Sequence, residues 1–106
     1  MEMHQVRYFL AICEERNFTR AAQRCRVSQP SLTRAIRLLE AEFGGELFYR
    51  ARPKVRLTML GSLMRTHLKR IHQEAELAHD IAQKYSLILP IKSRVLSWPQ
   101  ALERWV

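Results

Sequence analysis

The sequence predicts a mainly α-helical fold, in which three short helices are followed by a small β-hairpin and one long helix. The main observation is the spacing of apolar residues. In the third helix they recur at intervals of four, three and four, as on a helix packed against a core, at Leu32, Ile36, Leu39 and Phe43. The second observation is that residues typical of helix ends separate the segments, namely Asn17, Ser28 and the pair Gly44-Gly45.

The first two helices are expected at residues 4–16 and 18–24. The buried stripe of the first helix consists of Val6, Phe9, Leu10 and Cys13. Asn17 lies where an N-cap of the second helix belongs, because its side chain can accept from the free N–H groups of the next turn. Ala21 and Ala22 are small enough for the following helix to cross closely, as a helix-turn-helix requires.

The third helix begins after Ser28, with Pro30 in its first turn, and ends at Gly44-Gly45. Its outer side is rich in hydrogen-bond donors and poor in acids, at Gln29, Pro30, Thr33, Arg34 and Arg37. Free N–H groups and the positive end of the helix dipole at its start attract phosphate. This side therefore suits an anionic partner that presents hydrogen-bonding base edges, and DNA is such a partner.

Residues 47–49 and 55–57 are short β-capable runs that flank a basic tip, Arg50-Ala51-Arg52-Pro53-Lys54. We interpret them as a two-stranded hairpin whose cations contact phosphates or a minor groove. The alternative is a solvated charged loop, which is less favoured beside a candidate recognition helix. Three helices with such a hairpin make a winged helix-turn-helix, expected over residues 1–57.

Thr58 can cap a final helix over residues 58–85, about 40 Å long. A heptad-like seam follows it, at Leu68, Ile71, Ala75, Ala78, Ala82 and Tyr85. We expect three other apolar residues to anchor the base of this helix to the domain, namely Leu60, Leu63 and Met64. Because so small a core cannot cover a seam of this length, a second copy of the chain is expected to cover it, giving a homodimer rather than a monomer.

Charge supports a nucleic-acid partner. The chain has 18 Lys and Arg against 10 Asp and Glu, and residues 16–56 alone contain ten basic and three acidic side chains. Charge by itself leaves open a soluble domain that happens to be basic. Cys13 and Cys25 are too few for a disulfide framework or a zinc site, so reduced packing residues are expected. The sequence contains neither an apolar signal core nor a membrane-spanning run, and we expect a cytoplasmic protein.

Taken together, these segments resemble the N-terminal domain of the LysR-type transcriptional regulators. The resemblance covers roughly residues 4–85. The matching segments, in the family's order and spacing, are Phe9–Glu14, Phe18–Ala22, Val27–Leu32, Ile36 with Leu39-Glu40, Gly44 with Leu47-Phe48 and Arg50, and Leu57-Thr58 with Gly61. Thr33 stands where the family usually has Ser, Cys25 where it has Leu, and Leu60 where it has Ala.

The resemblance implies a dimer formed through the long helix, which binds an interrupted inverted repeat in bacterial promoter DNA. The residues that it places on base edges are Gln29, Pro30, Thr33 and Arg34. Phosphate contacts are expected from Thr19, Ser28, Ser31, Arg37, Arg50, Arg52 and Lys54. The chemistry agrees, because Gln suits the paired donor and acceptor of adenine, Arg suits guanine, and hydroxyls suit phosphate oxygens.

Members of this family continue into an effector-binding domain of two α/β lobes. The residues after Tyr85, 86–106, are too few to form one, so we expect that domain to be absent and small-molecule regulation with it. We interpret 86–106 as an atypical tail, with a truncation, a frame-shift remnant and an accessory segment as alternatives. Residues 87–89 suggest a stub of strand, and residues 99–106 a turn or two of helix.

An enzyme is not expected, because no constellation of nucleophile, base or metal ligands is present. His72 and His79 lie one heptad apart, and a metal between two helices of a dimer is conceivable, but solvated or seam-flanking histidines fit better. We expect no cofactor. The main alternative function is a protein-interaction module that heterodimerises with full-length relatives through the long helix and modulates them.

Overall fold

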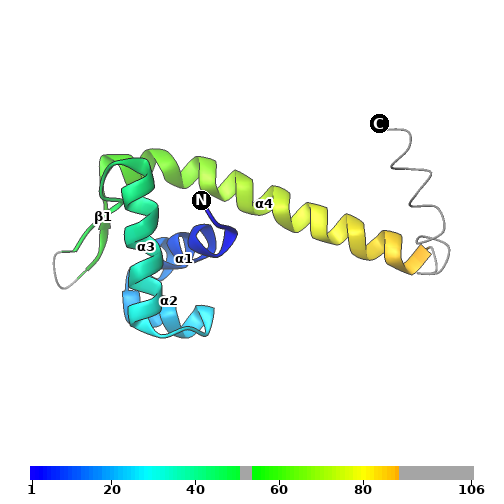
Figure 1. Cartoon of the computed structure of the whole chain (residues 1–106), viewed down its shortest axis with the longest axis horizontal. Coiled ribbons are helices and arrows are strands. Elements are labelled where there is room, and N and C mark those ends of the chain that lie inside the picture. The colour runs from blue at the N-terminus through cyan, green and yellow to red at the C-terminus, as the bar shows by residue number, and fades with distance from the viewer. Residues whose placement is uncertain (51–53, 89–106) are drawn as a thin grey trace. The chain divides into compact units, whose positions relative to one another are not determined.

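The structure is a computed structural model that describes residues 1–50 and 54–88 of the chain. Its element order is α1 (Met3–Glu15), α2 (Phe18–Cys25), α3 (Gln29–Phe43), β1 (Phe48–Tyr49), β2 (Arg56–Leu57) and α4 (Met59–Ile88) (Figure 1). The two strands are antiparallel, with Phe48 opposite Leu57 and Tyr49 opposite Arg56. The prediction of a mainly helical, winged helix-turn-helix fold is confirmed.

The ends of the short helices follow from their capping residues. Asn17 Oδ1 accepts from the backbone N–H of Arg20 at 2.8 Å, and Ser28 Oγ accepts from that of Ser31 at 3.2 Å. Gly44 ends α3 with a φ of 76°. The turn between α2 and α3 contains no glycine, and Arg26 takes the left-handed conformation there with a φ of 59°.

The core of the first compact unit, Met1–Gln73, lies between α1, α2, α3, the hairpin and the start of α4. Its largest fully buried side chains are Phe9, Phe48, Ile12, Leu32, Ile36, Leu39, Leu47, Leu68 and Val6. The ring of Phe48 packs on those of Phe9 and Phe18, with centroids 5.3 and 5.8 Å apart, so the hairpin is fixed to α1 and α2 by aromatic contact.

A close approach of α4 to the hairpin fixes where that helix begins. Thr58 Oγ1 donates to the carbonyl of Glu46 at 2.6 Å and accepts from the N–H of Gly61 at 3.0 Å, so Thr58 caps α4 as expected. A Cβ atom at Gly61 would lie 2.1 Å from the carbonyl oxygen of Leu47. This position therefore requires glycine, because any side chain would push α4 away from the hairpin.

Three expectations for the long helix were wrong. Leu68, expected on the dimer seam, is 1% exposed and belongs to the domain core, whereas Leu63, expected as an anchor, is 62% exposed. The helix continues to Ile88, so Leu87 and Ile88 are helical and do not form a stub of strand. Leu89 and the rest of the expected tail, including residues 99–106, lie outside the described residues. Of the helices described, none has the length and apolar character needed to cross a membrane.

Candidate nucleic-acid interface

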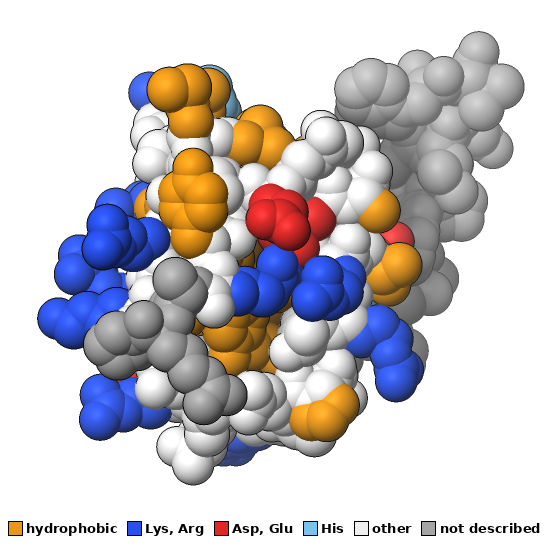
Figure 2. Space-filling model, turned by 90° about the vertical axis from the view of Figure 1, so that its left-hand side faces the viewer, with side chains coloured by type: hydrophobic (Ala, Val, Ile, Leu, Met, Phe, Trp, Pro, Cys, Tyr) orange, Lys and Arg blue, Asp and Glu red, His pale blue; other side chains and the backbone are white. Residues whose placement is uncertain are grey.

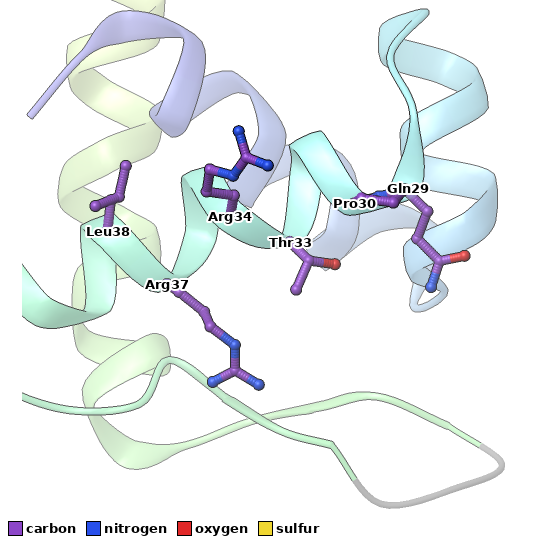
Figure 3. Close-up of a pocket in the computed structure, with 6 residues that line it drawn as sticks. All are labelled: Gln29, Pro30, Thr33, Arg34, Arg37 and Leu38. Carbon is purple, nitrogen blue, oxygen red and sulfur yellow. The ribbon is translucent and has the colours of Figure 1, made fainter.

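The outer side of α3 carries two rows of side chains at intervals of four residues. Gln29, Thr33 and Arg37 project to one side of the helix, and Arg34 and Leu38 project to the other (Figure 3). Together with Pro30 they line a shallow open groove. We call these six residues the recognition face. Thr33 is partly buried, and the other five are exposed.

The packing of α3 determines which of its sides is free. Leu32, Ile36 and Leu39 are all 0% exposed and hold the opposite side against α1 and α2. Ala21 and Ala22 of α2 are also buried, which allows the close crossing that the sequence predicted. Leu38 is 58% exposed, and the sequence did not predict its place on this side, because an apolar residue beside Leu39 is expected to join the buried stripe.

The same unit exposes many cations and few acids near this face. Figure 2 shows Lys and Arg side chains spread over the side that carries the hairpin, while acidic side chains occupy little of it and their largest group lies near the centre of the view. The described cations of α3 and the hairpin include Arg34, Arg37, Lys54 and Arg56, and all four are exposed. Such a surface attracts a polyanion at long range, and contact between the two releases the counterions that are condensed on the polyanion.

A buried carboxylate joins α3 to the hairpin. Glu40, 6% exposed, accepts a hydrogen bond from the N–H of Leu47 at 2.7 Å through Oε2 and another from Arg50 Nη2 at 2.8 Å through Oε1. The guanidinium of Arg50 also lies over the ring of Phe18, 5.7 Å from its centroid. The hairpin is therefore tied by charge-assisted bonds to the helix that carries the recognition face.

This arrangement gives Arg50 a different environment from the one expected at a basic tip. Its side chain is 25% exposed and its guanidinium is already paired, so it holds the hairpin in place instead of standing free for phosphate. Lys54 is exposed, as expected of a phosphate contact. Arg52 lies outside the described residues. Tyr49 is 55% exposed beside Arg56 in the hairpin, and both are candidates that the sequence analysis did not name.

The hydroxyl groups expected to contact phosphate have partners of their own. Ser28 Oγ donates to Ser31 Oγ at 2.8 Å, so Ser31 retains its own proton for another acceptor. Thr19 Oγ1 donates to Gln29 Oε1 at 2.9 Å, which links the first turn of α2 to the first residue of α3. Of the three hydroxyl groups expected to contact phosphate, only that of Ser31 can therefore still donate its proton to a phosphate oxygen.

Neither cysteine has the chemistry of a reactive site. Burial raises the pKa of the Cys13 thiol to about 11, and burial also raises the pKa of Cys25. Both thiols are therefore protonated near neutral pH and behave as packing groups. Across residues 1–50 and 54–88, no group of three or more His, Cys, Asp or Glu side chains is arranged to hold a metal ion.

A family model matches most of the domain that carries the recognition face. Residues 3–62 match the model of the bacterial regulatory helix-turn-helix proteins of the lysR family. The chain belongs to the lysR family. This confirms the resemblance inferred from the sequence, and members of this family are transcriptional regulators and not enzymes.

Curated relatives agree with this assignment. The chain is 49% identical over 63 residues to the probable cat1 operon transcriptional activator of Acinetobacter lwoffii, an overlap that covers 59% of this chain and 21% of the relative. It is 42% identical over 84 residues to the Hca operon transcriptional activator HcaR of Escherichia coli, covering 79% of this chain and 28% of HcaR. The overlap thus spans about a fifth to somewhat over a quarter of the length of these two relatives.

Solved structures of lysR-family domains share the fold. The CbnR DBD–DNA complex superposes with a TM-score of 0.74 at 35% identity, covering 81% of this chain and 99% of that one. The BenM DBD complex with catB site 1 DNA gives a TM-score of 0.76 at 30% identity, covering 81% and 97%. In both cases the structural similarity extends over nearly the entire solved domain.

The Glu40 contacts lead to a prediction about stability. In Glu40→Ala, the N–H of Leu47 and the guanidinium of Arg50 lose their acceptor in a largely buried position, so the free energy of unfolding should fall by about 2 to 4 kcal/mol. Urea denaturation followed by circular dichroism measures it.

Glu42→Ala on the same helix is the matched control. Its carboxylate pairs with the N-terminal amine at 2.9 Å but is 48% exposed, so the loss should stay under about 1 kcal/mol. Equal losses in the two variants would show that the Glu40 contacts do not hold the hairpin to α3.

Proposed function

We propose that this lysR-family chain binds double-stranded DNA sequence-specifically as a homodimer and regulates transcription from promoters that contain an interrupted inverted repeat. The observation that carries the proposal is the recognition face, which combines an exposed amide, exposed guanidinium groups and the partly buried hydroxyl of Thr33, with no acid among its six residues. An α-helix with such a surface fits the major groove, where base edges offer acceptors in a sequence-dependent order.

The roles within this face follow from side-chain chemistry. Arg34 is proposed to donate to O6 and N7 of a guanine, and Gln29 and Thr33 to contact neighbouring base edges. Pro30 and Leu38 offer apolar contact to the methyl group of thymine, which only the major groove presents. Ser31, Arg37 and Lys54 are proposed to contact phosphates and so to fix the position of α3 on the duplex.

Two solved neighbours support this proposal. CbnR DBD and BenM DBD were both determined in complexes with DNA, and their folds match that of this chain over about four-fifths of its length. The six residues of the recognition face come from a helix that begins with the same capping turn that the sequence predicted. The proposed base contacts at Gln29, Pro30, Thr33 and Arg34 all belong to that exposed surface.

The homodimer is proposed to form through α4. Beyond Gln73 this helix exposes apolar side chains at intervals of four, four and three, at Leu77 (52%), Ile81 (67%), Tyr85 (46%) and Ile88 (76%). Ala78 and Ala82 are exposed between them, and Ile71 is 36% exposed. The proposed seam therefore includes Leu77 and Ile81, which the seam expected from sequence did not. Leu68 is left out of it, because its side chain is buried in the domain core.

A twofold pair has a direct consequence for the binding site. Two copies related by a twofold axis present two identical recognition faces, so the preferred DNA contains two half-sites in inverted orientation. Heterodimers with complete relatives would use the same seam on α4. We favour the homodimer because each copy presents an equivalent apolar stripe to its partner.

Selection from a pool of randomised duplexes tests the proposed function. Repeated capture by the chain at about 0.1 M salt should enrich two short motifs that are inverted copies of each other at a fixed separation, because each motif meets one recognition face. Sequencing of the recovered pool measures this, and an unchanged base composition after selection would contradict specific recognition.

The recovered duplex allows base and charge effects to be separated. Arg34→Ala should weaken binding to this duplex by about 1 to 3 kcal/mol more than to a scrambled one. The control Arg24→Ala removes the same charge from an exposed residue that pairs with Glu14 and Glu15, and it should affect both duplexes alike.

The proposed seam gives a separate prediction. Ile81→Glu places a charge in the middle of the apolar stripe, so the dimer dissociation constant should rise at least tenfold in sedimentation equilibrium. Gln83→Glu adds the same charge two residues away, near the opposite side of the helix, and should leave the constant within about twofold. If both variants are as dimeric as the unmodified chain, α4 is not the interface.

A further inference from the structure

The bond between Thr19 and Gln29 connects the two helices of the helix-turn-helix at their N-termini. Thr19 lies in the first turn of α2, and Gln29 is the first residue of α3. The hydroxyl of Thr19 donates to Gln29 Oε1 at 2.9 Å, across ten residues of sequence. Both residues are exposed, so packing does not force the contact, and the bond itself fixes the orientation of the amide.

The orientation of a glutamine amide decides what it can recognise. A free Gln offers one acceptor and two donors, and it pairs with adenine by using both ends at once. Here the carbonyl oxygen is turned toward Thr19 and is already hydrogen-bonded, while the Nε2 group remains at the other end of the amide. Figure 3 shows this side chain on the same side of α3 as Thr33 and Arg37.

Electrostatics favours this orientation over the reversed one. The first turn of a helix carries unpaired N–H groups and a partial positive charge. Thr19 lies in that turn of α2, and an amide whose oxygen points there has its negative end toward positive charge. With the amide reversed, the partly positive Nε2 group would face the same turn, which is unfavourable.

We propose that Thr19 is a positioning residue that determines which base Gln29 recognises. With its oxygen held by Thr19, Gln29 donates through Nε2 to an acceptor on the base edge, such as N7 or O6 of guanine or O4 of thymine. Cytosine is disfavoured, because its N4 group is a donor. This inference rests on the proposed function, and it differs from the bidentate pairing with adenine that the side chain alone suggested.

The same bond bears on the phosphate contact expected of Thr19. A threonine hydroxyl has one proton, and here Gln29 receives it. Thr19 therefore has no proton left to donate to a phosphate oxygen while Gln29 is held. The two roles have different consequences, since loss of a phosphate contact weakens binding to every duplex, whereas loss of orientation alters preference at one position.

The test uses the duplex recovered by selection, with each of the four base pairs placed in turn at the position where Gln29→Ala loses its preference. For the unmodified chain, guanine or thymine should be bound more tightly than cytosine, and 7-deazaguanine should weaken binding if N7 is the acceptor. Thr19→Val removes the hydroxyl at nearly constant shape, and preference at this position should fall about three- to tenfold. Thr19→Ser keeps the hydroxyl and should keep the preference.

Gln29→Glu distinguishes the two amide orientations. A carboxylate of the same shape cannot donate, so preference should move to cytosine if Gln29 normally donates. If Gln29→Glu keeps the original preference, the amide normally faces the base with its oxygen, and the inference is wrong.

Equal weakening of all four duplexes by Thr19→Val would also overturn it, because that result indicates a phosphate contact. Both of these outcomes leave the proposed function intact. That function fails instead if the unmodified chain shows no preference at any position of any duplex.

Discussion

The arrangement of the recognition face and the hairpin depends on one buried carboxylate. Glu40 lies on the side of α3 away from solvent and accepts from both the backbone of Leu47 and the guanidinium of Arg50. Short two-residue hairpins are marginally stable on their own, and these charge-assisted bonds add to the aromatic packing of Phe48 that fixes the hairpin to α1 and α2. The contact between Arg50 and the ring of Phe18 extends this attachment to α2. The recognition face of α3 and the hairpin therefore form one surface.

This constraint explains why the cations of the hairpin have different roles. Arg50 forms an ion pair with Glu40 inside the domain, while Lys54 and Arg56 are exposed. The division resembles that on α3, where Leu32, Ile36 and Leu39 hold the helix and the recognition face stays free. In each element the buried apolar or ion-paired residues hold the backbone in place, and the exposed donors remain available for hydrogen bonds to a polyanion.

The sequence predicted what depends on local chemistry. The caps at Asn17, Ser28 and Thr58 and the apolar stripe of α3 were identified correctly, because capping and helical period are set by neighbouring residues. The errors concern contacts between distant residues. Period alone could not distinguish Leu68, which enters the core, from exposed Leu63. Nor could composition show that Arg50 pairs with Glu40 or Thr19 with Gln29, each across ten residues.

The most direct test of the account is to map where DNA touches the chain. A ¹⁵N-labelled sample titrated with the selected duplex should show its largest amide shift changes at residues 29–38 of α3 and at residues 54–57 of the hairpin. A scrambled duplex should shift the hairpin more than the N-terminal half of α3. Changes concentrated on the exposed side of α1, around Arg7 and Glu14, would place DNA elsewhere and contradict the account.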